Sequence, residues 1–130
     1  MSKKIITFGT FDVFHVGHLR LLNRARSFGD SLVVGVSTDE LNMDKKGRAP
    51  IYAQEERIEI IAALSCVDLA FFEESLELKE QYVVDHGAGI LVMGDDWKGK
   101  FDALRNICEV IYLPRTPAIS TTEVIEKIRY

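Results

Sequence analysis

The sequence has few cysteines and no long apolar run. Its two cysteines, Cys66 and Cys108, lie far apart without the spacing of a metal knuckle, so we expect buried free thiols. The N-terminal residues pass directly from lysines into IITFG. This apolar stretch is too short and too soon interrupted for a signal peptide or a membrane-spanning helix. We therefore expect a cytoplasmic protein that does not insert into a membrane.

The sequence also has no excess of positive charge, since its formal net charge is -4. Nucleic-acid binding normally requires a basic face or stripe, so we expect no nucleic-acid partner. An anionic ligand would instead need a local positive pocket. With 130 residues, 47% of them apolar, and no low-complexity block, the chain is predicted to form one domain over 1–130.

Short apolar, β-branched runs alternate with longer amphipathic stretches along the chain. The runs predict buried strands at 4–8, 32–36, 69–72, 90–93 and 110–113. The stretches predict helices over 16–28, 54–65, 76–86 and 100–106, and a last helix from about Thr121. This order predicts an α/β fold, a doubly wound five-stranded parallel sheet with its ligand at the carboxyl ends of the strands. Residues 43–53 are predicted to form a loop long enough to fold over a site.

The segment FGTFDVFHVGHLRLL, residues 8–22, spans the end of the first strand and the start of the next helix. Free backbone N–H groups and the helix dipole make such a junction an anion site. His15 and His18 lie three residues apart on one helix face, where two imidazoles can hold phosphate oxygens. Gly17 between them lets a ligand approach the backbone.

Two other roles are open to this histidine pair. The rings can cap the helix or fill the core, which is the commoner role of a single histidine. They can also bind a metal with Asp12 as a third ligand, but histidines at this spacing without a further clear ligand rarely complete a metal site. A pair at the end of a first strand favours phosphate binding over both.

A second candidate anion site lies near the C-terminus, in RTPAISTTEVI from Arg115 to Ile125. Ser120 and Glu123 have the spacing of a capping box, which predicts the start of a helix. A helix N-terminus rich in hydroxyl groups and preceded by an arginine also suits a triphosphate. Both roles are compatible.

GTFDVFHVGH together with RTPAISTTEVI resembles the HxGH nucleotidyltransferase superfamily, and its cytidylyltransferases in particular. VSTDE, MGDDWKGKFD and YLPRT narrow the resemblance to the members that act on glycerol 3-phosphate. The resemblance covers nearly the whole chain and implies the superfamily's Rossmann-like fold. It implies transfer of a cytidylyl group from CTP to sn-glycerol 3-phosphate, which forms CDP-glycerol and pyrophosphate.

The resemblance assigns roles to residues of this chain by position. It implies that the catalytic residues are His15, His18, Lys45 and Arg115. The nucleotide-binding residues implied are Gly9, Thr10, Phe11, His15, Gly17, His18, Lys46, Arg48, Asp95, Arg115, Thr116, Ile119, Ser120, Thr121 and Thr122. Those implied for the acceptor are Asp12, Lys45, Lys79 and Trp97. Without the resemblance, the charged side chains of DKKGR and Lys79 would be interpreted as solvated surface groups. Asp39 would be either a helix cap or a ligand contact.

The resemblance further implies a homodimer and a Mg²⁺ ion bound mainly through the CTP phosphates, with no protein metal site. Two alternatives remain open: the same reaction with ATP or another phosphorylated alcohol, and a sensor that binds CTP without turnover. Relatives commonly carry arginine where this chain has Ser65 and glycine where it has Ala118.

Overall fold

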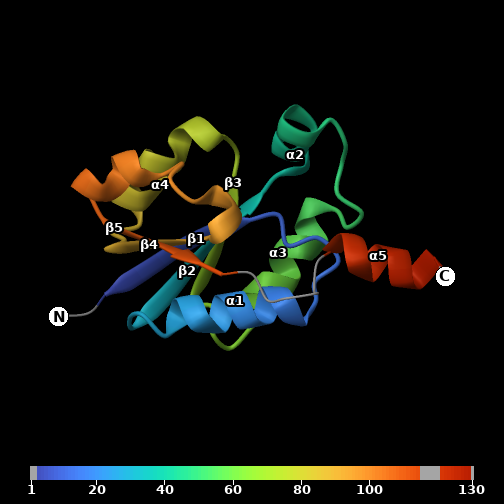
Figure 1. Ribbon diagram of the computed structural model, residues 1–130, viewed down its shortest axis with the longest axis horizontal. Helices are drawn as coiled ribbons and strands as arrows, with labels where there is room; N and C mark the ends of the chain where they lie inside the picture. Colours follow the sequence, from blue (N-terminus) through green and yellow to red (C-terminus); the bar gives the residue numbers. More distant parts are fainter. Residues whose placement is uncertain (1–2, 115–120, 130) are drawn as a thin grey trace.

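Strands and helices alternate through the part of the chain that this computed structural model describes, residues 3–114 and 121–129 (Figure 1). The strands are β1 (Lys4–Gly9), β2 (Ser31–Ser37), β3 (Leu69–Glu73), β4 (Ile90–Gly94) and β5 (Glu109–Leu113). The helices are α1 (Val16–Arg26), α2 (Asp39–Lys46), α3 (Gln54–Ala62), α4 (Lys79–Asp85) and α5 (Thr121–Arg129). Short 3₁₀ helices cover Leu76–Leu78, Asp95–Trp97 and Asp102–Asn106.

The five strands form one parallel sheet in the order β3-β2-β1-β4-β5. β1 lies in the centre, and the chain builds outward first on one side of it and then on the other. The strand order therefore reverses between β1 and β4, and ligands of such sheets bind outside the carboxyl ends of the strands at this point. The predicted fold class is confirmed.

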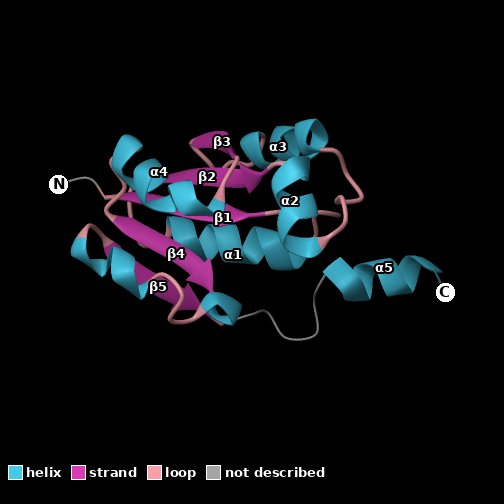
Figure 2. Cartoon of the chain, turned by 90° about the horizontal axis from the view of Figure 1, so that it is seen from above, coloured by secondary structure: helices cyan, strands magenta, loops and turns pink. Residues whose placement is uncertain are grey.

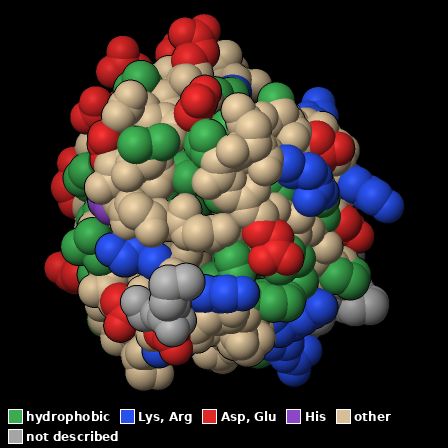
Figure 3. Space-filling model, turned by 90° about the vertical axis from the view of Figure 1, so that its left-hand side faces the viewer, with side chains coloured by type: hydrophobic (Ala, Val, Ile, Leu, Met, Phe, Trp, Pro, Cys, Tyr) green, Lys and Arg blue, Asp and Glu red, His purple; other side chains and the backbone are tan. Residues whose placement is uncertain are grey.

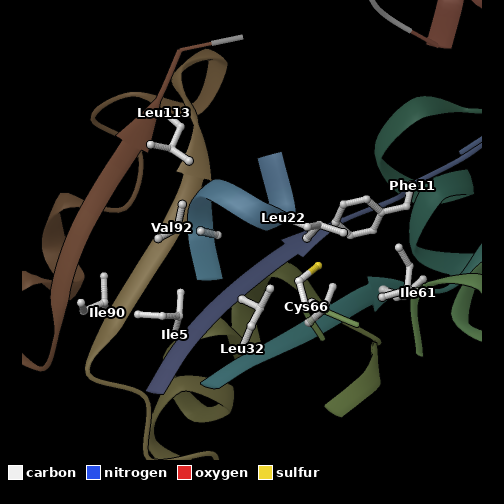
Figure 4. Close-up of a cluster of buried hydrophobic side chains, with 12 residues drawn as sticks. Ile5, Phe11, Leu22, Leu32, Ile61, Cys66, Ile90, Val92 and Leu113 are labelled. Atoms are coloured by element: carbon white, nitrogen blue, oxygen red, sulfur yellow. The ribbon is translucent and has the colours of Figure 1, made fainter. Parts of the chain in front are cut away.

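Apolar side chains cover both faces of the sheet, as the continuous apolar strands predict. On one face, Ile5, Leu32 and Val92 pack against Leu22 of α1 and Ile61 of α3 (Figure 4). On the other face, a second cluster packs against α4 and the 3₁₀ helix at 102–106; its buried members are Ile6, Phe8, Val33, Val83, Ala88, Leu91, Met93, Cys108 and Val110. Cys66 and Cys108 are buried free thiols, as expected.

Three expected elements differ from the structure. Residues 43–46 belong to α2 rather than to a loop, because Thr38 caps this helix through its hydroxyl and Gly47 ends it with a left-handed φ of 71°. The helix expected over 76–86 is a 3₁₀ turn followed by α4. Only 3₁₀ structure forms at Asp102–Asn106, where a helix was expected over 100–106.

α5 lies beyond the carboxyl end of the sheet and beside the turn that leads into α1 (Figures 1 and 2). At the opposite end of the molecule, acidic and basic side chains are interspersed on the surface (Figure 3). Within the described ranges, no helix has the length and apolar character needed to cross a membrane.

Candidate functional site

The chain turns sharply between β1 and α1. Phe11 and Val13 have φ values of 55° and 46°, a left-handed conformation that bulky and β-branched residues rarely adopt. The carboxylate of Asp12 between them accepts hydrogen bonds from the backbone N–H groups of Ile51 (2.7 Å) and Tyr52 (2.9 Å). The loop at 51–52 thus holds the strained turn in place.

The two histidines of HxGH cap α1, each with one ring nitrogen. Nδ1 of His15 accepts a hydrogen bond from the N–H of Gly17 (3.0 Å), and Nδ1 of His18 accepts from the N–H of His15 (3.2 Å). A neutral imidazole carries its proton on the nitrogen that does not accept, so Nε2 is the N–H donor in both rings. These atoms lie 3.4 and 3.5 Å from the Thr121 hydroxyl, so both donors face the start of α5.

Burial keeps His18 neutral. Desolvation and the neighbouring His15 lower the pKa of His18 from 6.5 to about 4, although Asp12 acts in the opposite direction. Burial also lowers the pKa of His15. The rings stack with centroids 3.9 Å apart, which disfavours two adjacent positive charges. At neutral pH this pair offers two N–H donors rather than two cations.

Three cavities adjoin at the carboxyl ends of β1 and β4. The HxGH cavity, of about 280 Å³, is lined by Phe8, Gly9, Thr10, Phe11, His15, Gly17, His18, Leu21, Arg24, Met93, Gly94, Asp96, Trp97, Pro114 and Thr121. The α5 cavity, of about 400 Å³, is lined by Thr10, Asp12, Asn42, Lys46, Arg48, Ala49, Pro50, Ile51, Thr121, Thr122, Ile125, Glu126 and Arg129. The Lys79 cavity, of about 360 Å³, is lined by Phe8, Gly9, Thr10, Lys45, Lys46, Glu73, Leu76, Lys79, Met93, Asp96 and Trp97. Thr10 lines all three, so they meet where β1 ends.

Most of the described candidate residues line at least one of these cavities. Asp95 lines none, whereas the neighbouring Asp96 lines the HxGH and Lys79 cavities. The structure thus brings the histidines, the loop lysines and the end of β4 together around one space.

The cations of DKKGR approach the cavities from the end of α2. Lys45 is half-buried and burial lowers its pKa, with Glu73 acting to raise it. Lys46 and Arg48 are exposed, and both line the α5 cavity. Because Lys45 and Lys46 lie in the last turn of α2, a helix carries these two groups, which sequence reasoning placed on a flexible loop.

Lys79 is not a surface residue, since its exposed fraction is only 5%. Its Nζ contacts the carboxylate of Glu73, the last residue of β3. Sequence analysis did not select Glu73. A polar residue directly after a predicted buried strand, LAFF, was the signal that could have found it.

Arg57 is a second residue that sequence analysis missed. Its side chain is fully buried and donates to the backbone carbonyls of Thr10, Ser37 and Tyr52 and to the Asp39 carboxylate. It thereby ties α3 to the ends of β1 and β2. An arginine in the apolar stripe shared with Ile61 and Leu64 was the available signal. The contact also gives Asp39 a role as an ion-pair partner, while Thr38 is the helix cap.

Comparisons with known proteins place this site in a family. The sequence model of the cytidylyltransferase-like family matches residues 6–127. The chain belongs to the cytidylyltransferase-like family. The predicted resemblance is confirmed at this level, with a match that contains both HxGH and RTPAISTT.

The curated relatives of this cytidylyltransferase-like chain cover almost its full length. Glycerol-3-phosphate cytidylyltransferase of Bacillus subtilis strain 168 is 50% identical over 126 residues, 97% of this chain and 97% of that protein. The protein of the same name from Staphylococcus aureus NCTC 8325 is 44% identical over 97% of this chain and 95% of its own. The crystal structure of a lipopolysaccharide core biosynthesis protein from Thermoplasma volcanium shares the fold, with a TM-score of 0.78 and 24% identity over 89% of this chain and 99% of that one.

Part of the predicted cytidylyltransferase site lies outside the described residues. This part comprises Arg115, Thr116, Ile119 and Ser120, and Ala118, where relatives commonly carry glycine, also lies there. The described residues Thr121 and Thr122 follow directly. The hydroxyl of Thr121 donates to the backbone carbonyl of Asp12 (3.1 Å), which fixes the start of α5 against the HxGH turn.

The donor set of the site suits a cation that is carried by its substrate. Among residues 3–114 and 121–129, no three His, Cys, Asp or Glu side chains are grouped as ligands of a metal ion. Mg²⁺ typically keeps several water ligands and takes others from substrate phosphates, with one or two carboxylates from the protein. Asp96, exposed on the wall shared by the HxGH and Lys79 cavities, is one carboxylate that could take part.

Proposed function

We propose that this chain is a glycerol-3-phosphate cytidylyltransferase, which transfers a cytidylyl group from CTP to sn-glycerol 3-phosphate and releases pyrophosphate. The observation that carries the proposal is the 50% identity to a relative of this name, over 97% of both chains. The geometry supports it, because a cavity beside the HxGH donors adjoins a cavity with lysines in its wall. CTP would occupy the first, and the acceptor the second.

The reaction needs positioning more than it needs a strong base. An oxygen of the acceptor phosphate is already ionised at neutral pH, so it attacks the α-phosphorus of CTP without loss of a proton. A new P–O bond forms, and the bond between the α-phosphorus and the bridging oxygen breaks as pyrophosphate leaves. Lys45 would hold the acceptor phosphate beside the nucleotide, where binding replaces an unfavourable bimolecular encounter.

The histidines act on the charge that develops during this transfer. Nε2–H of His15 and His18 would donate to phosphate oxygens of CTP, and the hydrogen bonds at Nδ1 fix both rings before the substrate binds. Such preorganised donors stabilise a transition state without reorganisation. Lys46, Arg48 and Arg115 would neutralise the triphosphate. Mg²⁺, bound through the phosphates, would supply further neutralisation of the leaving group.

Release of pyrophosphate tests the proposal. The assay contains Mg²⁺ and CTP with glycerol 3-phosphate, and separate reactions replace CTP by ATP or the acceptor by other phosphorylated alcohols. Turnover confined to CTP and glycerol 3-phosphate is the expected result. Turnover with another pair would keep the reaction class and change the substrate, and CTP binding without turnover under every condition would indicate a sensor.

We further propose that the enzyme is a homodimer that works in the cytoplasm, where nucleoside triphosphates are available. The proposal of a dimer rests on the family resemblance, and β3 at the sheet edge offers a partly apolar surface with Leu69 half exposed.

A further inference from the structure

A buried ion pair forms part of the wall of the Lys79 cavity. Glu73 ends β3 and Lys79 begins α4, and their exposed fractions are 1% and 5%. Nζ of Lys79 lies 2.5 Å from Oε2 of Glu73 and 4.3 Å from the centre of the Phe8 ring. The two side chains are therefore held in one geometry by an opposite charge and an aromatic face.

Stability alone does not account for this pair. Removing two charges from water costs several kcal/mol per ion before their attraction repays it, and apolar side chains of similar size often stabilise a protein equally well. The pair also leaves part of its hydrogen-bonding capacity unused. Among the described residues, Oε1 of Glu73 has no hydrogen-bond partner, and two of the three N–H groups of Lys79 remain available.

The free oxygen of Glu73 reaches the cavity. No side-chain nitrogen or oxygen in the described ranges is both fully buried and without a partner. Oε1 therefore retains a small accessible area, and Glu73 is one of the residues that line this cavity. A hydrogen-bond acceptor and a set of donors thus stand side by side in the wall.

The rest of the wall carries further charged groups, the two lysines of α2 and the carboxylate of Asp96. Lys45 and Lys46 line the same cavity and carry positive charges with no described salt-bridge partner, so they suit a phosphate group. Glu73 and Lys79 have a combined charge of zero. A phosphorylated alcohol can therefore place its phosphate at the α2 lysines and its neutral portion at the pair.

We propose that the Glu73–Lys79 pair selects acceptors by reading neutral hydroxyl groups, with Glu73 accepting from one hydroxyl and Lys79 donating to another. The inference rests on the proposed function and extends it to the choice of acceptor. A vicinal diol satisfies both members and leaves them paired. An acceptor with an additional carboxylate is repelled by Glu73, and one with an ammonium group is repelled by Lys79.

Charge-changing variants test this selection with three acceptors of similar size. These are glycerol 3-phosphate, 3-phosphoglycerate with its carboxylate, and phosphoethanolamine with its ammonium. Values of kcat/KM are measured at saturating CTP for the wild type, Glu73→Gln and Lys79→Met. Glu74→Gln is the matched control, because this neighbouring glutamate is exposed and lines none of the three cavities.

The two variants are expected to shift selectivity in opposite directions. Glu73→Gln removes one negative charge from the wall and leaves Lys79 without its partner, so the ratio of kcat/KM for 3-phosphoglycerate over glycerol 3-phosphate rises roughly 10-fold or more. Lys79→Met removes one positive charge and leaves Glu73 without its partner, so it raises the ratio for phosphoethanolamine by a similar factor. In both variants kcat/KM for glycerol 3-phosphate falls while the KM for CTP is retained. Glu74→Gln keeps every ratio within about twofold of the wild type.

Equal losses toward all three acceptors in folded variants would overturn the inference, because a structural role predicts no change in the ratios. If a single variant does not fold, the double variant Glu73→Gln/Lys79→Met replaces it. It should lose preference for the diol without gaining either charged acceptor, and unchanged selectivity would again overturn the inference. If the wild type does not turn over glycerol 3-phosphate, the proposed function fails; the pair is then tested by calorimetric binding of the same three probes.

Discussion

At the scale of single residues, each histidine of HxGH has a separate task at each ring nitrogen. Nδ1 accepts a backbone N–H and starts α1, while Nε2 faces the site. The structure confirms the capping role that the sequence left open. The proposed phosphate-binding role would use the other nitrogen, so the two roles do not compete.

Isosteric amides separate these two tasks at His18. In His18→Asn the amide oxygen takes the place of Nδ1 and keeps the cap, but the Nε2 donor is lost. In His18→Gln the amide nitrogen takes the place of Nε2 and the cap is lost. We expect His18→Asn to lower kcat by about 100-fold or more with little change in Tm, measured by pyrophosphate release and thermal unfolding.

His18→Gln is the complementary control. It should keep more activity than the asparagine variant and lose about 1 kcal/mol of stability with the cap. Equal activity of the two amides would contradict a role for the Nε2 donor.

The depressed pKa of His18 predicts how stability depends on pH. The imidazole has a pKa of about 4 in the folded chain and 6.5 as its ordinary value. Between these values the unfolded state binds more protons, so the free energy of unfolding falls as pH decreases from about 6.5 to about 4. Urea unfolding at pH 7.5, 6 and 5 should show the wild type losing stability relative to His18→Asn, to which it is nearly equal at pH 7.5. A difference between them that is constant with pH would show that His18 does not titrate in this way.

Sequence reasoning located these residues because HxGH and the strand before it are local features. The tautomer of each histidine depends on the backbone groups that its ring contacts. Those contacts depend on the left-handed φ values of Phe11 and Val13, which local sequence preferences do not predict. Glu73 and Lys79 were harder to interpret, because their pairing requires β3 and α4 to pack together. The sequence shows only a glutamate after a strand and a lysine on a helix.

At the scale of elements, α3 serves the site without contributing a lining residue to its cavities. Arg57 projects from α3 and joins the ends of β1 and β2 to α2 through Asp39, which is 2.7 Å away. The α2 helix in turn carries Lys45 and Lys46. The helix boundaries near 43–46 were mispredicted because charge and Gly47 indicate a loop, whereas the Thr38 cap and the Arg57 contact stabilise a helix.

Replacing Arg57 should therefore affect the whole end of the sheet. Arg57→Met keeps most of the volume but removes every hydrogen bond to three backbone carbonyls and to Asp39. We expect the free energy of unfolding to fall by roughly 3 kcal/mol or more, measured by chemical denaturation. Arg20→Met on the exposed face of α1 is the matched control, with a change within about 0.5 kcal/mol. A similar small change at Arg57 would show that water replaces its hydrogen bonds.

At the scale of the whole molecule, the parallel sheet follows from the alternation of apolar runs and helices, and the position of the site follows from the strand order β3-β2-β1-β4-β5. Alternation predicts parallel pairing, and parallel pairing directs every strand end to one edge. Which strands lie next to each other depends on contacts between residues far apart in the sequence. The sequence therefore indicated a doubly wound sheet but did not specify which cavities would adjoin.

The proposed homodimer is a prediction at this scale. Light scattering coupled to size-exclusion chromatography should give twice the 14.7 kDa mass of one chain at micromolar concentration. Leu69→Glu places a charge on the exposed edge of β3 and should convert the dimer to monomer if this edge lies in the interface. A wild-type mass of one chain would contradict the dimer, and an unchanged dimer in the variant would place the interface elsewhere.

The hydrogen bond from Thr121 to the carbonyl of Asp12 joins residues that are 109 positions apart. During synthesis on a ribosome, the last strand, which ends at Leu113, emerges before Thr121 does. The nascent chain can therefore complete its sheet while its histidines still lack the partner that faces them. A chain that stopped after β5 would contain every strand of the sheet but lack the Thr121 hydroxyl that faces both histidines.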